Sequence, residues 1–156
     1  MTTPEVVSLV NFGVAERDVY KGGMIFEKHH DLQYSFFRVL DRYVSHGKVL
    51  GGDAYLVHDF NNYKHSKDSA HSDGDASDGR WRGLSLKDAV LLAMLYPFTG
   101  IFFYPHAVTP FFHTDQKTRN RPEGLQTIGF LNEAGDMITT NNSFDLVMET
   151  LWSLKI

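Results

Sequence analysis

The stretch KDSAHSDGDASDGR, residues 67–80, decides how this chain is interpreted. It holds four aspartates, one histidine and two glycines in fourteen positions, between two segments rich in aromatic residues. Three structures are compatible with that composition: a solvated loop, a calcium-binding loop, or one half of a catalytic metal site. Each of them makes a different demand on the spacing of the polar residues.

The spacing excludes an EF-hand calcium loop. Such a loop needs a glycine at its sixth position and a bidentate glutamate at its twelfth. Counted from Asp73, these two positions hold Asp78 and Leu84. A solvated loop is the commonest structure for a cluster of Ser, Asp and Gly, and it stays open beside the metal site.

A catalytic zinc site would take His71 and Asp78 as ligands and needs a second imidazole, with one coordination position left for water. The chain contains no cysteine, so nitrogen and oxygen atoms must bind any metal. The segment FFHTD, residues 111–115, supplies His113 on a predicted strand. Because side chains alternate between the faces of a strand, His113 and Asp115 should point the same way. One would then bind the metal while the other faces the bound water.

Composition indicates a single soluble domain over residues 1–156. With 156 residues and 42% hydrophobic residues, the chain is long enough to bury a core. The net charge of -4 and the lack of a long Lys/Arg run predict no nucleic-acid partner. The N-terminus does not resemble a signal peptide, so synthesis is expected in the cytoplasm. The longest apolar stretch, 89–98, is too short for a membrane span.

Periodicity predicts helices and short strands in alternation. Ser85 should cap a helix that ends near Pro97, and Gly47 should end an earlier one. Ser143 should cap a last helix that buries four apolar residues, namely Phe144, Val147, Met148 and Leu151. The predicted elements are helices 31–47, 84–97 and from 143, strands 48–60, 100–104 and 111–115, and a hairpin over 125–140 that turns at 132–135. This order predicts an α+β domain with a small antiparallel sheet flanked by helices. Trp81 is expected in its core.

The residues Ser69, His71, Gly74, Ala76 and Asp78 form a spaced motif, SxHxxGxAxD. It resembles the signature of the zinc D-alanyl-D-alanine carboxypeptidases and endolysin peptidases, a superfamily that includes lysostaphin-type and Hedgehog-type domains. In that family the motif carries two zinc ligands. The glycine suits a tight turn, and the alanine suits a crowded position in the core.

A second element, GIFFYPHAVTPFFHTD at 100–115, resembles the other family motif, an aromatic strand and turn followed by Phe-x-His-x-Asp. The two elements occur in the family order, and the resemblance covers about residues 28–118. It implies a Hedgehog/D-Ala-D-Ala-peptidase-like fold with Zn²⁺ bound by His71, Asp78 and His113. It also implies that Ser69 lies near the ligands or the substrate.

The sequence differs from the family pattern at the position of the residue that acts as general base. Many members carry a glutamate three residues before the second histidine, where this chain has Pro110. Asp115 is the first candidate for the base and His106, in the preceding turn, is the second. Asp115 would alternatively orient His113, a common role for a carboxylate beside a ligating imidazole.

The sequence also differs from the family pattern at the residue that binds the terminal carboxylate of the substrate. Carboxypeptidase members carry an upstream arginine, whereas this chain offers Lys64, which lacks the bidentate fork. This favours an endopeptidase over a carboxypeptidase. Tyr104 is a further candidate for contact with the substrate or an oxyanion. His58 and His65 flank the site and could line it, although ordinary placement on the surface is expected.

The predicted function is therefore zinc-dependent hydrolysis of amide bonds in peptidoglycan stem peptides or cross-links. The alternative is a zinc-containing binding or structural module without turnover, such as a virion component. By analogy with the family that the motifs resemble, we expect a phage-encoded enzyme that acts on the cell wall after release or within the virion. The bond that is cut and the oligomeric state stay open.

Overall fold

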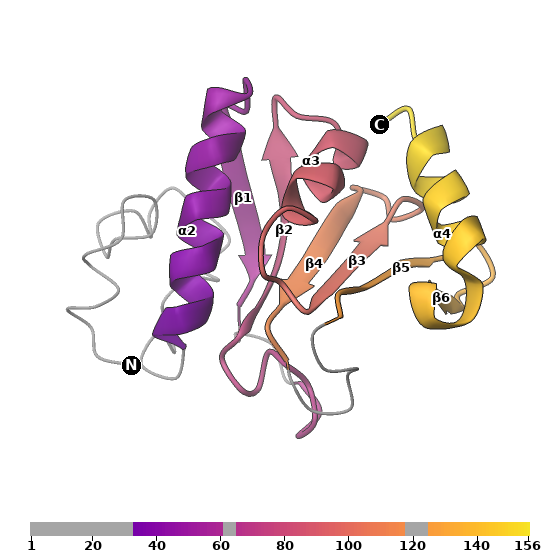
Figure 1. Cartoon of the computed structure of the whole chain (residues 1–156), viewed down its shortest axis with the longest axis horizontal. Helices are drawn as coiled ribbons and strands as arrows, with labels where there is room; N and C mark the ends of the chain where they lie inside the picture. Colours follow the sequence, from indigo (N-terminus) through magenta and orange to yellow (C-terminus); the bar gives the residue numbers. More distant parts are fainter. Residues whose placement is uncertain (1–32, 61–64, 118–124) are drawn as a thin grey trace.

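The computed structural model describes residues 33–60, 65–117 and 125–156. Three helices and six strands make up this part of the chain (Figure 1). In chain order they are α2 (Tyr34–Val49), β1 (Ala54–Asp59), β2 (Ala76–Arg82), α3 (Leu86–Ala93), β3 (Gly100–Tyr104), β4 (Phe111–Asp115), β5 (Thr127–Leu131), β6 (Met137–Thr139) and α4 (Thr140–Ser153). The sequence predictions for residues 1–32 and for Lys64 lie outside the described residues.

The six strands form one sheet in the order β1-β2-β4-β3-β5-β6. The α+β class is confirmed, but the predicted antiparallel sheet is wrong at one pairing, because β3 and β5 run parallel. Both edges of β4 are already paired, with β2 and with β3. Gly100 on β3 pairs with Asp115 at the end of β4 and with Thr127 at the start of β5. The chain therefore re-enters the sheet at the same end, on the free edge of β3, and β5 must run parallel to β3.

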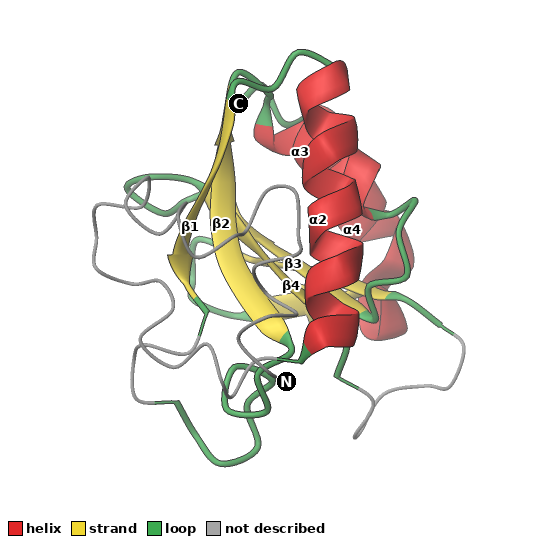
Figure 2. Ribbon diagram, turned by 90° about the vertical axis from the view of Figure 1, so that its left-hand side faces the viewer, coloured by secondary structure: helices red, strands yellow, loops and turns green. Residues whose placement is uncertain are grey.

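The three described helices lie together on one face of the sheet (Figure 2). The opposite face carries no described helix, and the half-buried side chains of β1, β2, β3 and β4 point to it. No helix in the described residues is both long enough and apolar enough to cross a bilayer.

Tyr43 of α2 is the centre of the core between the helices and the sheet. Its side chain is fully buried, and its hydroxyl accepts a hydrogen bond of 2.8 Å from the indole of Trp81. The same hydroxyl donates to the carbonyl of Ala89 in α3 over 3.0 Å. Tyr43 also packs edge-on against Tyr55 and Phe112 of the sheet. The core position predicted for Trp81 is confirmed.

Several element ends differ from the predictions. Gly47 does not stop its helix, since α2 continues to Val49. The strand predicted to begin at residue 48 begins only at Ala54, after Gly51 has taken a left-handed φ of 104°. Residues 76–82 form a strand that periodicity did not predict. The predicted cap is confirmed, because the Ser85 side chain accepts from the backbone N–H of Asp88.

The last helix also differs. It begins at Thr140 with Thr139 as its N-cap, and Ser143 lies at a kink with non-helical φ and ψ of -151° and 63°. Val147 and Leu151 are buried as predicted. Phe144 is 59% exposed, so its predicted burial is wrong. Phe144 lies in the first turn after the kink, nearer the start of α4 than the buried pair, and Trp152, near the other end of the helix, is also exposed.

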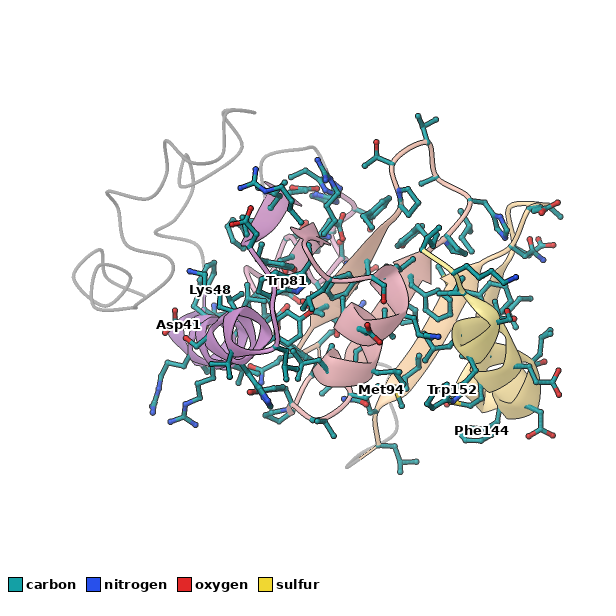
Figure 3. All side chains as sticks on the ribbon, turned by 90° about the horizontal axis from the view of Figure 1, so that it is seen from above. Asp41, Lys48, Trp81, Met94, Phe144 and Trp152 are labelled. Atoms are coloured by element: carbon teal, nitrogen blue, oxygen red, sulfur yellow. The ribbon has the colours of Figure 1, made fainter. Side chains whose placement is uncertain are left out.

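Position 47 requires glycine because the Trp81 ring, which lies beside α2 in Figure 3, leaves no room for a Cβ atom. A Cβ at Gly47 would lie 2.2 Å from Cζ2 of Trp81. Replacing glycine by alanine inside a helix normally stabilises a protein by about 0.5–1 kcal/mol. At this position the overlap must displace the indole from the core.

We expect Gly47→Ala to lower the free energy of unfolding by about 1–3 kcal/mol, as overpacking does. Urea denaturation monitored by circular dichroism measures this change. In a Trp81→Phe background the smaller ring should accommodate the methyl group, so that the loss caused by Gly47→Ala shrinks. An alanine variant as stable as the parent protein would contradict the proposed overlap.

Candidate metal centre

Three side chains from two distant motifs meet on the open face of the sheet. His71 lies in the loop before β2, Asp78 on β2 and His113 on β4. Oδ1 of Asp78 lies 2.8 Å from Nδ1 of His113 and 3.4 Å from Nε2 of His71. All three potential ligand atoms lie within 4.8 Å of one another. The structure thus brings together the three metal ligands that the sequence predicts.

Strand pairing and a tight loop produce this meeting. β2 and β4 are antiparallel neighbours, and their register places Asp78 directly opposite His113. The loop that carries His71 turns at Gly74, whose φ of 76° lies in the left-handed region that favours glycine. Ala76 is fully buried, and Ser69 Oγ accepts from the backbone N–H of His71 over 3.3 Å. The other motif residues therefore shape the loop that presents the imidazole.

The His71 ring is held so that one nitrogen faces the cluster. Its Nδ1–H donates to the carbonyl of Phe60 over 2.5 Å. A hydrogen bond at one imidazole nitrogen determines which tautomer is present and which nitrogen is available as a ligand. Nε2 of His71 is therefore the available ligand atom, and it is the atom that faces Asp78.

The His113 ring is also held by a hydrogen bond at one of its nitrogens, here to Asp115 at the end of the same strand. Its Nε2–H donates to Oδ2 of Asp115 over 2.8 Å, which leaves Nδ1 toward Asp78. Oδ1 of Asp115 accepts from the Thr99 hydroxyl and from the backbone N–H of Lys117, each over 3.1 Å. His113 and Asp115 do point the same way, as predicted. With both oxygens of its carboxylate engaged, Asp115 has the geometry of a residue that orients His113.

The donor set fits a divalent metal ion. Two imidazoles and a carboxylate are the ligands expected of zinc in a protein site without thiolates. Three ligands of a tetrahedral zinc, each about 2.0–2.1 Å from the ion, lie roughly 3.3 Å apart. The distances from Asp78 Oδ1 to the two imidazole nitrogens, 2.8 and 3.4 Å, bracket that value. A carboxylate or carbonyl on the far nitrogen of each imidazole is the usual support of a metal-ligating histidine.

The charges of the cluster are strongly coupled. Burial opposes ionisation of Asp78, but the hydrogen bond from His113, together with the neighbouring His71, outweighs it and holds the pKa of this carboxyl well below its usual range. Burial also opposes the charge on His113, yet hydrogen bonds to Asp115 and Asp78 raise the pKa of His113 to about 9. Without a metal, His113 is an imidazolium at neutral pH between two carboxylates. A metal ion must replace its proton on Nδ1, because a ligand atom has to be deprotonated.

The other predicted site residues lie at different distances from this cluster. Tyr104 stacks on Phe111 with ring centroids 4.3 Å apart, and burial, with added repulsion from Asp78, raises its pKa to about 12. His106 is exposed in the turn between β3 and β4, where its Nδ1 lies 3.7 Å from Glu133 and outside the ligand cluster. Lys64 falls outside the described residues.

Two further residues, His65 and Asp59, lie beside the cluster, and of these the sequence pointed only to His65. His65 was expected on the surface, but its ring stacks on His71 with centroids 4.3 Å apart, and its Nε2 lies 2.7 Å from Asp59 Oδ2. Asp59, His65 and His71 form a second group of potential metal ligands. A β-bulge between Val57 and Asp59 sets Asp59 opposite Asp78. No spacing in the sequence marks Asp59, because strand pairing alone reveals the bulge.

His58 also lies nearer the site than expected. It is half-buried on β1, and its ring packs edge-on against Phe111 with centroids 4.7 Å apart. Burial lowers the pKa of His58, although the nearby charges of Asp78 and Asp59 oppose this shift. Burial therefore favours the neutral form of this imidazole.

Comparison of the chain with protein-family models, with curated proteins and with solved structures finds no match. The interpretation of the cluster therefore rests on its geometry and on the spacing of its motifs.

The raised pKa of His113 predicts a pH dependence of stability. A folded-state pKa of about 9 against an ordinary value of 6.5 contributes stability that is fully present below pH 6.5 and is lost as the pH rises through 9. In the presence of a chelator, the free energy of unfolding should fall by an amount on the order of 1–3 kcal/mol between pH 6.5 and pH 9.5. Urea titrations across that range measure it, and His113→Gln should flatten the profile.

Asp75 should destabilise the fold at neutral pH. Burial, followed by the charges of Asp115 and Asp73, raises the pKa of Asp75 to about 6, and no described residue gives its buried Oδ1 a hydrogen bond. A raised carboxyl pKa costs stability above pH 6 and costs none below the unfolded value near pH 4. Asp75→Asn should therefore raise the melting temperature at pH 8 but not at pH 4. The exposed Asp145→Asn is the control, and an equal shift at both pH values would contradict the assignment.

Proposed function

We propose that this protein is a zinc-dependent peptidase that hydrolyses amide bonds in peptidoglycan stem peptides or cross-links. One observation carries the proposal: the ligands predicted from two separate motifs face one another, and the far nitrogen of each imidazole is hydrogen-bonded. The resemblance of both motifs to the D-Ala-D-Ala peptidase and endolysin superfamily supplies the reaction and the substrate class. It also supplies the proposal that the mixed sheet and its helices are a variant of the Hedgehog-type fold.

In this proposal, three residues bind the zinc ion and a fourth orients one of these ligands. His71 Nε2, Asp78 Oδ1 and His113 Nδ1 would hold the ion. When bound, zinc polarises a carbonyl and lowers the pKa of water, which makes a nucleophile available at neutral pH. Asp115 keeps the His113 ring in the orientation that directs Nδ1 toward the ion.

Tyr104 supplies a hydrogen-bond donor beside the cluster. A pKa of about 12 keeps its hydroxyl protonated at neutral pH, so it can donate to the oxyanion that forms when an amide carbonyl is attacked. Stacking on Phe111 restricts its ring. Ser69 already accepts from the His71 backbone, so we assign it to the loop and secondarily to the substrate.

Proton transfer requires a base other than the glutamate that Pro110 replaces. The sequence makes Asp115 a candidate for this base, but its carboxylate oxygens already accept hydrogen bonds from His113, Thr99 and Lys117. Two imidazoles are the other candidates: His106 in the β3–β4 turn, and His58 on the open face of the sheet. Separate alanine variants of the two histidines distinguish them, since loss of the base lowers kcat by about 10²–10⁴-fold.

The substrate would be cut within a peptide. No arginine lies between Asp59 and Ser69, so this segment offers no bidentate clamp for a terminal carboxylate. This favours an endopeptidase, with lysis of a bacterial wall by a phage as its proposed setting.

The alternative is a zinc-containing module that binds without turnover. The engagement of both Asp115 oxygens and the proline at position 110 favour it, because they remove two candidates for the base. Retention of all three ligands is compatible with both functions.

Metal analysis and an assay of wall hydrolysis separate the two functions. We expect one zinc per chain in the purified protein and release of new amino groups from peptidoglycan. His113→Ala should abolish zinc binding and lower the release at least 10³-fold, whereas His46→Ala, an exposed histidine at the end of α2, should leave both unchanged. Stoichiometric zinc without release on any peptidoglycan would support the binding module. Absence of zinc after reconstitution would overturn both.

A further inference from the structure

His65 and Asp59 form a pair directly behind one of the proposed metal ligands. The rings of His65 and His71 are nearly parallel, with an interplanar angle of 11° and centroids 4.3 Å apart. Nε2–H of His65 donates to Oδ2 of Asp59 over 2.7 Å. Asp59 is only 3% exposed, so the acceptor end of this hydrogen bond is buried.

The stacking argues against a second metal ion between these residues. An imidazole nitrogen directs its lone pair within the ring plane, and a zinc–nitrogen bond is about 2.0–2.1 Å long. Two parallel rings in van der Waals contact have no common point that lies in both planes at that distance. Nδ1 of His71 is also bonded to the Phe60 carbonyl. Although Asp59, His65 and His71 are close enough to be grouped, their rings are arranged for packing.

Backbone geometry holds the pair in place. The bulge after Val57 sets Asp59 opposite Asp78 in the β1–β2 ladder. β-bulges commonly redirect a side chain next to a functional site. Asp59 therefore anchors His65 from a strand, and strands position side chains more accurately than loops do.

We propose that Asp59 and His65 act as a clamp that positions His71 for metal binding. This inference rests on the metal site of the proposed function. His71 belongs to a loop, unlike the strand residues Asp78 and His113, so its ring needs additional restraint. The Phe60 carbonyl restrains the ring within its plane, and the face of His65 restrains the tilt of that plane. Nε2 of His71 is thereby held toward Asp78 before the ion arrives.

The clamp should contribute to metal affinity without contributing a ligand. Loss of residues that support a metal ligand typically lowers metal affinity 10–100-fold. We expect that loss for His65→Ala. His65→Phe keeps a flat ring against His71 and should bind zinc within about threefold of the parent protein. Asp59→Asn keeps an acceptor for His65 and should also have a small effect.

Zinc affinity is measured by competition with a chromophoric chelator, together with the visible spectrum of the Co²⁺-substituted protein. His65→Ala should weaken zinc binding and alter the Co²⁺ spectrum, whereas His65→Phe should restore both. His46→Ala is the matched control. Far-UV circular dichroism of each metal-free variant checks its fold, and should His65→Ala not fold, the Asp59→Ala variant tests the same anchor.

The possible results separate the clamp from the proposed function. Equal zinc affinity and an unchanged Co²⁺ spectrum in His65→Ala would overturn the clamp and leave the peptidase proposal intact. Equal losses in His65→Ala and His65→Phe, with no loss in Asp59→Ala, would also overturn it, because neither the stacked ring nor its anchor would then be the cause. Two zinc ions per chain, one of them lost in His65→Ala, would replace the clamp by a second metal site. Zinc binding with the expected order of variants but no hydrolysis would support the clamp and refute the peptidase.

Discussion

The pairing of β2 with β4 is the constraint on which the site depends. It sets Asp78 opposite His113 and at the same time sets Gly79 opposite Phe112, a core residue. A slip of one residue would turn every side chain of a strand to the other face. Such a slip would expose Phe112 and bury His113 among aromatic rings. The hydrophobic core on the helical face thus enforces the register of the polar cluster on the open face.

Burial of this cluster has an electrostatic cost that only mutual pairing offsets. Charged groups taken out of water need partners and hydrogen bonds. Asp78, His113 and Asp115 meet that need as a continuous chain in which the imidazolium lies between two carboxylates. The proton on Nδ1 of His113 occupies the place that a metal ion would take. The hydrogen-bonded cluster therefore already gathers the side chains that could hold a metal ion, and an ion would have to displace the Nδ1 proton of His113.

The parts of the structure that could be predicted are those with local signals. The Ser85 cap, the strands at 100–104 and 111–115, the hairpin turn and the ligand trio each depend on residue types at short spacings. The parallel pairing of β5 could not be predicted, because it depends on which strand edges were already occupied. The position of Asp59 depends on a bulge, and that of His65 on its contacts with Asp59 and His71. Gly47 was interpreted as a helix stop because glycine usually has that role, whereas Trp81, distant in sequence, is what requires it.

The two faces of the sheet differ in function: one packs against the helices to form the core, and the other carries the polar cluster. On the helical face, Tyr43 links α2 to α3 and to Trp81 of β2 by hydrogen bonds within an aromatic core. These contacts fix β2 against the helices, and its pairing with β4 sets Asp78 opposite His113. His71 is the ligand that the core does not reach, because it belongs to a loop. On the open face the Phe60 carbonyl accepts a hydrogen bond from its ring and the ring of His65 stacks on it, so two neighbours outside the cluster restrain this proposed ligand.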